Sequence, residues 1–240
     1  MHWIFICLHT KLKNLPHHNY FVYDNIMKKE ICVSFKTFSK IRKDTLLANA
    51  ENDHCFKQTN SSVLVSAPHG VPQTRLGKLK VAEIGTIPVA TLFAQNTNSN
   101  LLIKTKNNHD DANYDTDCEY RQTLANIIKT QKIKYLIDIH GLAKFRPFDI
   151  NLGSNFEQNT KQNPKLLISL KNALESAGFS VSIDEPFCAG PQTIAGFFAK
   201  QYGIWSIQIE INCDITNNPK NIDKCNQLIN TLIDWHNRNY

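Results

Sequence analysis

Two histidines in this chain stand where short apolar runs of sequence end. His69 follows the run VLV in SSVLVSAPHG, and His140 follows the run in YLIDIHG, where Gly141 is predicted to turn the chain. Runs of this kind are typical of strands buried on both faces of a parallel sheet. Because ligands of open α/β sheets bind beyond the carboxyl ends of the strands, both histidines are predicted to lie at a functional site.

A third run, SIQIEIN, alternates apolar residues around Glu210. Burying a carboxylate in an apolar strand is costly unless a partner satisfies it. One interpretation is a buried salt bridge with Arg146. The other is a general base whose pKa is raised by its surroundings. We predict that the three strand ends face one another around a metal ion.

Imidazole nitrogens and a carboxylate oxygen are suitable ligands for zinc (Zn2+). A catalytic zinc ion usually has three protein ligands and one open position, and we choose Glu83, 14 residues after His69, as the third. A single histidine before a glycine, such as His69, is more often a turn residue than a metal ligand. The presence of His140 in the same position after a second strand favours the role of metal ligand for both. Zinc lowers the pKa of a bound water molecule to about 7, and Glu210 would then pass a proton from that water to a leaving amine.

Three further polar residues are candidates for substrate binding. Arg146, six residues past His140, suits a substrate carboxylate or an oxyanion, and its alternative is an ion pair with Asp149. Arg75 is a weaker candidate, with solvent exposure as the alternative. Asn113, in the loop DDANYD, is a candidate hydrogen-bond donor or acceptor to the substrate, and its alternative is a turn cap.

Composition limits the classes of function. The chain has 240 residues, is 42% hydrophobic and carries a net charge of +6. Residues 1–50 hold eight basic and three acidic residues, so most of the charge lies there and not on a basic face of the folded body. This pattern disfavours nucleic-acid binding. No apolar run approaches the roughly 20 residues of a membrane span, and a cytoplasmic protein without a membrane partner is predicted.

Seven cysteines are scattered without a CxxC pair, which predicts reduced thiols and no disulfide framework. Cys188, in PFCAGPQT, raises the alternative of a thiol nucleophile. Nothing in its sequence surroundings supplies an obvious base, so we do not favour this alternative.

Strands and helices alternate after residue 60, which predicts a three-layer α/β/α domain over residues 61–240. Residues 1–60 are predicted to be a partly disordered extension, with residues 1–26 outside the fold. Strands are expected to end near residues 69 and 140 and to cover 101–104, 148–153, 179–183 and 207–212. Helices are expected over 86–95, 119–131, 164–178 and 195–202 and from residue 219, with polar loops over 71–81 and 107–117.

Taken together and in this order, the segments PHG, AEIGT, DANYD, DIHG with R-x-x-DI-x-LG, PF-x-x-G and IQIEIN resemble the N-formylglutamate amidohydrolase family. The resemblance covers about residues 61–215. It implies the zinc carboxypeptidase-like fold, an α/β/α sandwich around a mixed, mostly parallel sheet. It also implies His69, Glu83 and His140 as zinc ligands and Glu210 as the catalytic glutamate.

The sequence departs from the related carboxypeptidases in two places. Asn113 matches the Asn of their D-x-N-R motif, but Tyr114 replaces the Arg that binds a substrate carboxylate, so that contact is either absent here or supplied by Arg146. Their metal-binding His and Glu are three residues apart, and here the gap is 14.

The predicted function is zinc-dependent hydrolysis of a linear amide bond in a small acyl-amino acid or short peptide. The alternatives are a zinc carboxypeptidase, a deacylase of the succinylglutamate desuccinylase or aspartoacylase type, and, outside enzymes, a metal-free binding module. The sequence does not indicate an oligomeric state.

Overall fold

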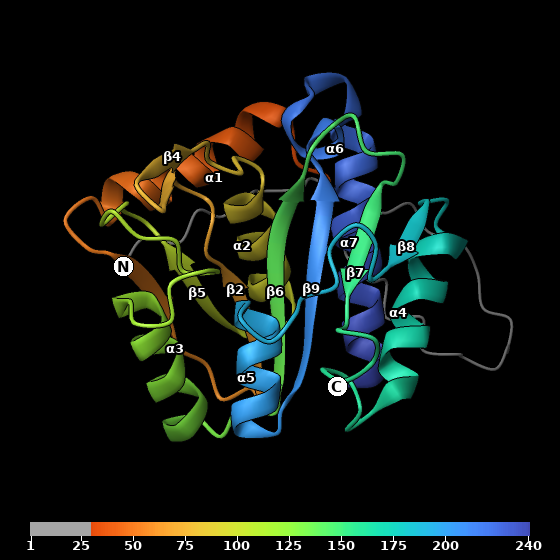
Figure 1. Cartoon of the computed structure of the whole chain (residues 1–240). Helices are drawn as coiled ribbons and strands as arrows, with labels where there is room; N and C mark the ends of the chain where they lie inside the picture. Colours follow the sequence, from red (N-terminus) through yellow and green to blue (C-terminus); the bar gives the residue numbers. More distant parts are fainter. Residues whose placement is uncertain (1–29) are drawn as a thin grey trace, which may run out of the picture. The chain divides into compact units, whose positions relative to one another are not determined.

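A computed structural model describes residues 30–240 of the chain. Its centre is a seven-stranded sheet in the order β1-β5-β2-β6-β9-β7-β8, with helices on both faces (Figure 1). The strands are β1 (His54–Lys57), β2 (Val63–Ala67), β5 (Asn100–Lys104), β6 (Tyr135–Leu142), β7 (Ile150–Gly153), β8 (Val181–Ile183) and β9 (Trp205–Asn212). A separate hairpin is formed by β3 (Gln73–Arg75) and β4 (Lys78–Lys80).

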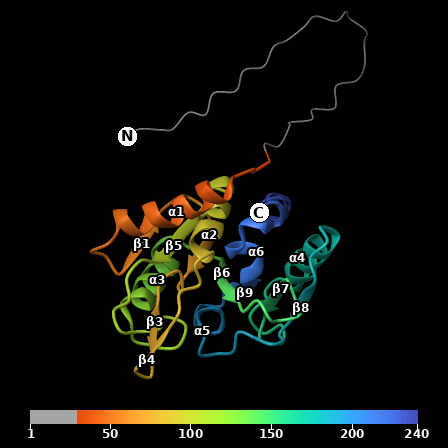
Figure 2. The ribbon, with the colours of Figure 1, turned by 90° about the horizontal axis from the view of Figure 1, so that it is seen from above.

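The helices of the described residues surround the sheet when the molecule is seen from above (Figure 2). They are α1 (Phe35–Ala48), α2 (Thr86–Asn96), α3 (Glu119–Thr130), α4 (Pro164–Ser176), α5 (Ile194–Tyr202), the short α6 (Cys213–Asn217), a 3-10 turn η1 (Pro219–Asn221) and α7 (Ile222–Asn239). The local sequence explains where several of these helices begin. The Ser34 and Thr193 side chains cap α1 and α5, and Pro164 opens α4.

The sheet is mixed and mostly parallel, as predicted. β5, β2, β6 and β9 run parallel to one another, while β7 is antiparallel to β9 and β1 is antiparallel to β5. The carboxyl ends of β2, β6 and β9 therefore meet at one edge of the sheet. In the register of β6 and β9, His140 pairs directly with Glu210, so the two side chains project from the same face.

Two apolar cores complete the three layers. On one face, α3 and α5 cover Leu64, Leu102 and Leu136 of the sheet. On the other face, α1, α2, α4 and α7 pack on a larger core that includes Val65, Ile137, Ile207 and Ile209. Strands β2, β5 and β9 are buried along their whole length, which explains why they appear in the sequence as continuous or alternating apolar runs.

The structure corrects four expectations about the elements. The fold begins before residue 60, because β1 pairs with β5 and α1 buries Phe38 in the larger core. Strand β6 continues through Gly141 to Leu142, since its pairing with β9 holds it extended past His140. The polar segment 71–81 contains the β3–β4 hairpin, and the short helix α6 follows β9. The predicted extension over residues 1–26 lies outside the described residues.

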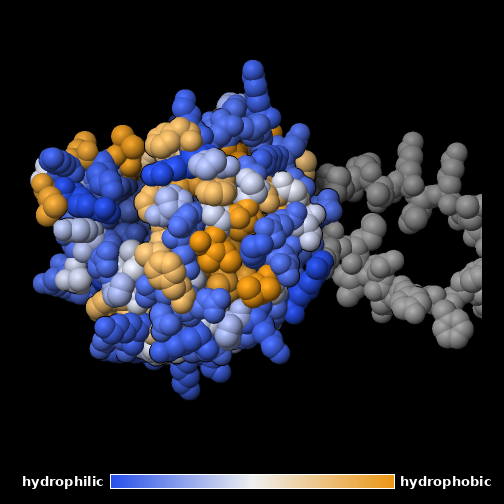
Figure 3. Space-filling view, turned by 45° about the vertical axis from the view of Figure 1, so that its right-hand side comes forward, coloured by the Kyte–Doolittle hydropathy of each residue, from blue (hydrophilic) through white to orange (hydrophobic). Residues whose placement is uncertain are grey.

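The described part of the chain contains no helix long and apolar enough to cross a membrane. Its six cysteines are all free thiols, as their spacing predicted. One face of the molecule is largely hydrophilic and has an apolar area near its middle (Figure 3).

Candidate metal centre

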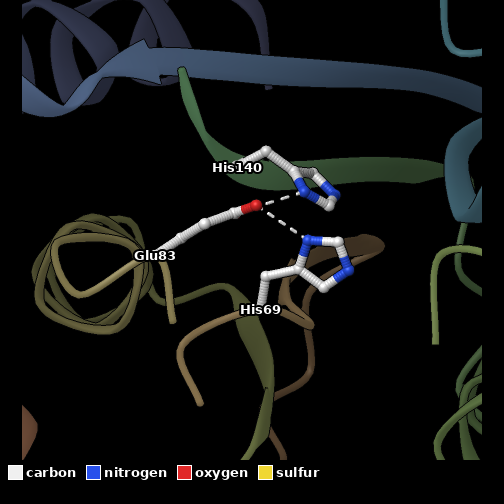
Figure 4. A group of neighbouring side chains, drawn as sticks. All are labelled: His69, Glu83 and His140. Carbon is white, nitrogen blue, oxygen red and sulfur yellow. Dashed lines mark hydrogen bonds and ion pairs between the residues drawn. The ribbon is translucent and has the colours of Figure 1, made fainter. Parts of the chain in front are cut away.

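Three side chains from separate parts of the sequence converge at the edge where β2 and β6 end (Figure 4). His69 follows β2, Glu83 lies three residues before α2, and His140 projects from β6. One ligand atom from each of these residues lies within 4.8 Å of the other two. Both histidines are buried, and Glu83 is partly exposed, so the group is accessible from one side.

Glu83 joins the two imidazole rings. Its Oε1 lies 2.8 Å from Nδ1 of His69, and its Oε2 lies 3.4 Å from Nδ1 of His140. The backbone N–H of Gly141 donates a hydrogen bond to the same Oε2 at 2.8 Å. The ring centroids of the two histidines are 4.7 Å apart. Both rings therefore direct Nδ1 toward one carboxylate.

The other nitrogen of each ring contacts a buried aspartate. Nε2 of His69 lies 2.9 Å from Asp111, and Nε2 of His140 lies 3.0 Å from Asp138. A carboxylate behind a metal-binding histidine fixes the tautomer and the orientation of the ring. Asp138 was detectable in the sequence, because residues two apart in a strand share a face, but we did not predict it. Asp111 lies 42 residues from its histidine, and sequence spacing did not indicate the contact.

The surroundings stabilise positive charge at this point. Burial lowers the pKa of His69, but the charge of Glu83 and the hydrogen bond to Asp111 outweigh it and raise the pKa. Burial also lowers the pKa of His140, but the charge of Asp138 outweighs this effect. The pKa of His140 therefore rises well above its ordinary value. Burial raises the pKa of Glu83, yet the charges of His69 and His140 hold it well below its ordinary value.

The donor set fits a divalent cation. Two imidazole nitrogens with the same orientation and a carboxylate lie together, and the nitrogen on the far side of each ring already contacts a carboxylate. Three protein ligands of this kind are what an open catalytic metal site requires. His69, Glu83 and His140, the residues predicted as ligands, are the ones that the structure brings together.

Substituting Asp138 by asparagine is expected to weaken metal binding about 10- to 100-fold, because an amide cannot orient and polarise His140 as a carboxylate does. Isothermal titration of the metal-free protein with zinc measures the change. Asp117→Asn, an exposed substitution in the loop before α3, is the matched control and should leave the affinity unchanged. Equal affinity of Asp138→Asn and the parent protein would contradict the role of Asp138.

Ion pairs hold the loop that carries Asp111. Nζ of the buried Lys104 lies 2.6 Å from Asp53 and 3.0 Å from the carboxylate of Asp110. Nε of Arg75 donates to Oδ2 of Asp111 at 2.8 Å. Arg75 is partly exposed and forms an ion pair with Asp111, which contacts His69.

Glu210 lies beside the cluster on the central strand β9. Its Oε1 accepts a hydrogen bond from Nε2 of Gln208 at 2.8 Å, and no salt bridge with Arg146 occurs among the described residues. Burial raises the pKa of Glu210 to about 7, and the positive charge of His140 acts in the opposite direction. A carboxyl group with this pKa can both accept and release a proton near neutral pH.

Arg146 lies on the loop after β6. Its guanidinium carbon is 5.4 Å from the ring centroid of Phe145 and 5.7 Å from that of Phe187. The alternative ion pair with Asp149 is not the observed contact, because Asp149 pairs with Lys224 at 2.6 Å. Nε of Arg146 is buried without a hydrogen-bond partner among the described residues, so a donor remains for an anion.

Asn113 and Cys188 are the remaining two polar candidates, and neither belongs to the three-residue cluster. Oδ1 of Asn113 accepts a hydrogen bond from the backbone N–H of Ile194 at 2.7 Å and so satisfies the start of α5. Its Nδ2 lies 3.4 Å from Oε1 of Gln208. Cys188 is a free, partly buried thiol on the loop before α5 and is not part of the three-residue cluster.

No known family model matches this chain, and no curated protein matches it by sequence. Solved structures do match its fold. N-formylglutamate amidohydrolase from Ralstonia eutropha aligns with a TM-score of 0.53 and 12% identity over 78% of this chain and 97% of that one. A bacteriophage poly-gamma-glutamate hydrolase aligns with a TM-score of 0.50 and 15% identity over 80% of this chain and 93% of that one.

A carboxypeptidase-like structure also matches. It is a putative carboxypeptidase from Burkholderia mallei. It aligns with a TM-score of 0.50 and 12% identity over 78% of this chain and 60% of that one. Identities this low establish the fold and not the substrate. The resemblance predicted from the sequence is therefore confirmed at the level of architecture: this chain has the mixed-sheet α/β/α fold of N-formylglutamate amidohydrolase and the zinc carboxypeptidase-like structures.

Proposed function

We propose that this protein is a zinc-dependent hydrolase that cleaves the amide bond of an N-acyl amino acid. The observation that carries the proposal is the convergence of His69, Glu83 and His140, with Glu210 paired to His140 in the sheet register. Support also comes from the fold, which is that of an N-formylglutamate amidohydrolase and a poly-gamma-glutamate hydrolase, both enzymes that act on glutamate-containing substrates by their names.

His69, Glu83 and His140 would hold the zinc ion. The chemistry that a bound zinc ion supplies at such a site is polarisation of the amide carbonyl and acidification of water. Asp111 and Asp138 keep the imidazole rings in the tautomer that presents Nδ1. By holding the zinc ion, His69, Glu83 and His140 would determine where the amide carbonyl must bind.

Glu210 moves the proton in this mechanism. Its carboxylate accepts a proton from the water molecule that adds to the amide carbon. It then donates that proton to the nitrogen as the carbon–nitrogen bond breaks. The products are a carboxylic acid and a free amine, and Glu210 returns to its starting state. Its pKa of about 7 suits both transfers near neutral pH.

Arg146 binds the negative charge of the substrate in our proposal. Its guanidinium lies over two phenylalanine rings and retains an unpartnered Nε, and a guanidinium fork matches a carboxylate geometrically. Nδ2 of Asn113 is the second polar group that can reach a substrate from this side. The substrate partner remains a small acyl-amino acid or short peptide.

A substrate panel tests the proposal. Zinc-loaded protein is incubated with N-formyl, N-acetyl and longer-chain N-acyl amino acids, beside dipeptides with free carboxyl ends, and the released amine is quantified. We expect hydrolysis of acyl-amino acids that a chelator abolishes and added zinc restores. Cleavage of the peptides alone would identify a carboxypeptidase instead. A folded protein with one zinc ion per chain that cleaves none of these amides would contradict the proposal.

A further inference from the structure

A cavity of about 630 Å3 opens directly beside the candidate metal centre. Glu83 and His140 form part of its wall. Cavities of this size typically enclose a ligand of drug-like dimensions. Most of the remaining wall is apolar and is contributed by Val81, Ala82, Leu142, Ala143, Phe145 and Ile211.

The mouth of the cavity is also unusually apolar. Val81 is 87% exposed and Phe145 is 78% exposed, although both line the cavity. Exposed apolar residues that gather at a concave site mark a surface that binds an apolar group. Lys80 and Lys144 line it too and are exposed, so their aliphatic stems extend the apolar wall while the ammonium groups stay in water.

The groups assigned to proton transfer and to the substrate carboxylate do not line the cavity. Among the described residues, neither Glu210 nor Arg146 is part of its wall. The cavity opens at the strand ends, where Ile211 from one face of the sheet and His140 and Leu142 from the other face line it.

The guanidinium carbon of Arg146 lies 5.4 Å from the ring centroid of Phe145, which lines the cavity, and 5.7 Å from that of Phe187. The backbone N–H of Phe187 donates to Oδ1 of Asn151. Asn151 is the register partner of Glu210 in β7 and β9. The groups assigned to the leaving amine and to the carboxylate of the amino acid therefore do not form the cavity wall, and the apolar cavity is left for the acyl half of the amide.

We propose that this cavity holds the acyl group of the substrate and that the preferred substrates carry an extended apolar acyl chain in place of a formyl group. This inference rests on the proposed hydrolase function and specifies its substrate class. A formyl group would fill almost none of the cavity. Each further methylene that enters it should raise kcat/KM about fourfold, because burying one CH2 is worth about 0.8 kcal/mol and 1.4 kcal/mol corresponds to tenfold.

The test measures kcat/KM of the zinc-loaded protein for formyl, acetyl, butyryl, hexanoyl and octanoyl derivatives of one amino acid, glutamate. We expect a progressive rise from formyl to hexanoyl, on the order of a thousandfold in total if all five added carbons are buried. Equal or falling kcat/KM along the series would overturn the inference and leave the hydrolase proposal intact. Hydrolysis of no member of the series would count against the hydrolase proposal itself.

Two variants test whether this cavity determines the preference for long acyl chains. Ala143→Trp places an indole at the cavity wall from an exposed position, so folding should be preserved. We expect the ratio of hexanoyl to formyl kcat/KM to fall at least about fivefold in this variant. Ala50→Trp, an exposed position after α1 that does not line the cavity, is the matched control and should keep the parent ratio. An unchanged ratio in Ala143→Trp would show that the acyl chain binds elsewhere.

Discussion

Replacing His140 by alanine is expected to remove zinc from the protein and to abolish hydrolysis. The substitution leaves two of the three candidate ligands, and it also leaves Asp138 buried without its imidazole partner. Parent protein equilibrated with zinc and then desalted should retain about one ion per chain, and the variant should retain less than about a tenth of that. Elemental analysis by plasma mass spectrometry measures both values.

His109→Asn is the matched control for this loss. His109 is exposed on the loop before Asp110 and has a positive φ of 61°, which asparagine adopts readily, and it is not part of the three-residue cluster. It should retain full zinc content. Circular dichroism of each variant separates loss of the metal from loss of the fold. Stoichiometric zinc in a folded His140→Ala protein would exclude this residue as a ligand.

Glu210→Gln is expected to keep the metal and lose turnover. The amide is nearly the same size and still accepts the hydrogen bond from Gln208, but it cannot take up a proton. The rate constant kcat should fall by roughly a hundredfold or more, with zinc content unchanged. Steady-state kinetics on the best substrate of the panel, with elemental analysis of the same sample, provide the measurement.

The pH profile separates a proton-transfer role from a structural one. The carboxylate form of Glu210 is the active form of the base, so kcat/KM of the parent protein should rise with pH as this group loses its proton. Burial raises the pKa of Glu210 to about 7, and a nearby cation favours the carboxylate, so this limb should lie at or below pH 7. Residual activity of Glu210→Gln should lack the limb. Unchanged turnover in the variant would remove Glu210 from the mechanism.

Much of the architecture was predictable because the strands that carry the site are buried. An interior parallel strand needs apolar residues on both faces, so a polar residue within or just after such a run is conspicuous. His69, His140 and Glu210 were recognised for this reason. The helix from Thr86 and the helix from Pro164 were equally readable, since periodic apolar residues and a proline at the start are local signals.

The partners of these residues were not predictable to the same extent. Asp111 contacts His69 in a loop that Arg75 and Lys104 also contact through ion pairs to Asp111 and Asp110, and these residues are dispersed along the chain. The ion pair between Arg75 and Asp111 was likewise not indicated by the sequence. The contribution of β1 and α1 was missed because their sequences are polar and each buries only part of one face.

The sequence by itself determined most of the strands and helices after residue 60, the donor atoms at the strand ends and the resemblance to a fold. These properties depend on local periodicity and on residue chemistry. Only the tertiary structure decided that both imidazoles present Nδ1 to Glu83, that aspartates stand behind them, and that an apolar cavity opens at their side. Ring orientation and cavity shape depend on side chains that meet across strands and loops distant in the chain, and sequence spacing carries no record of those contacts.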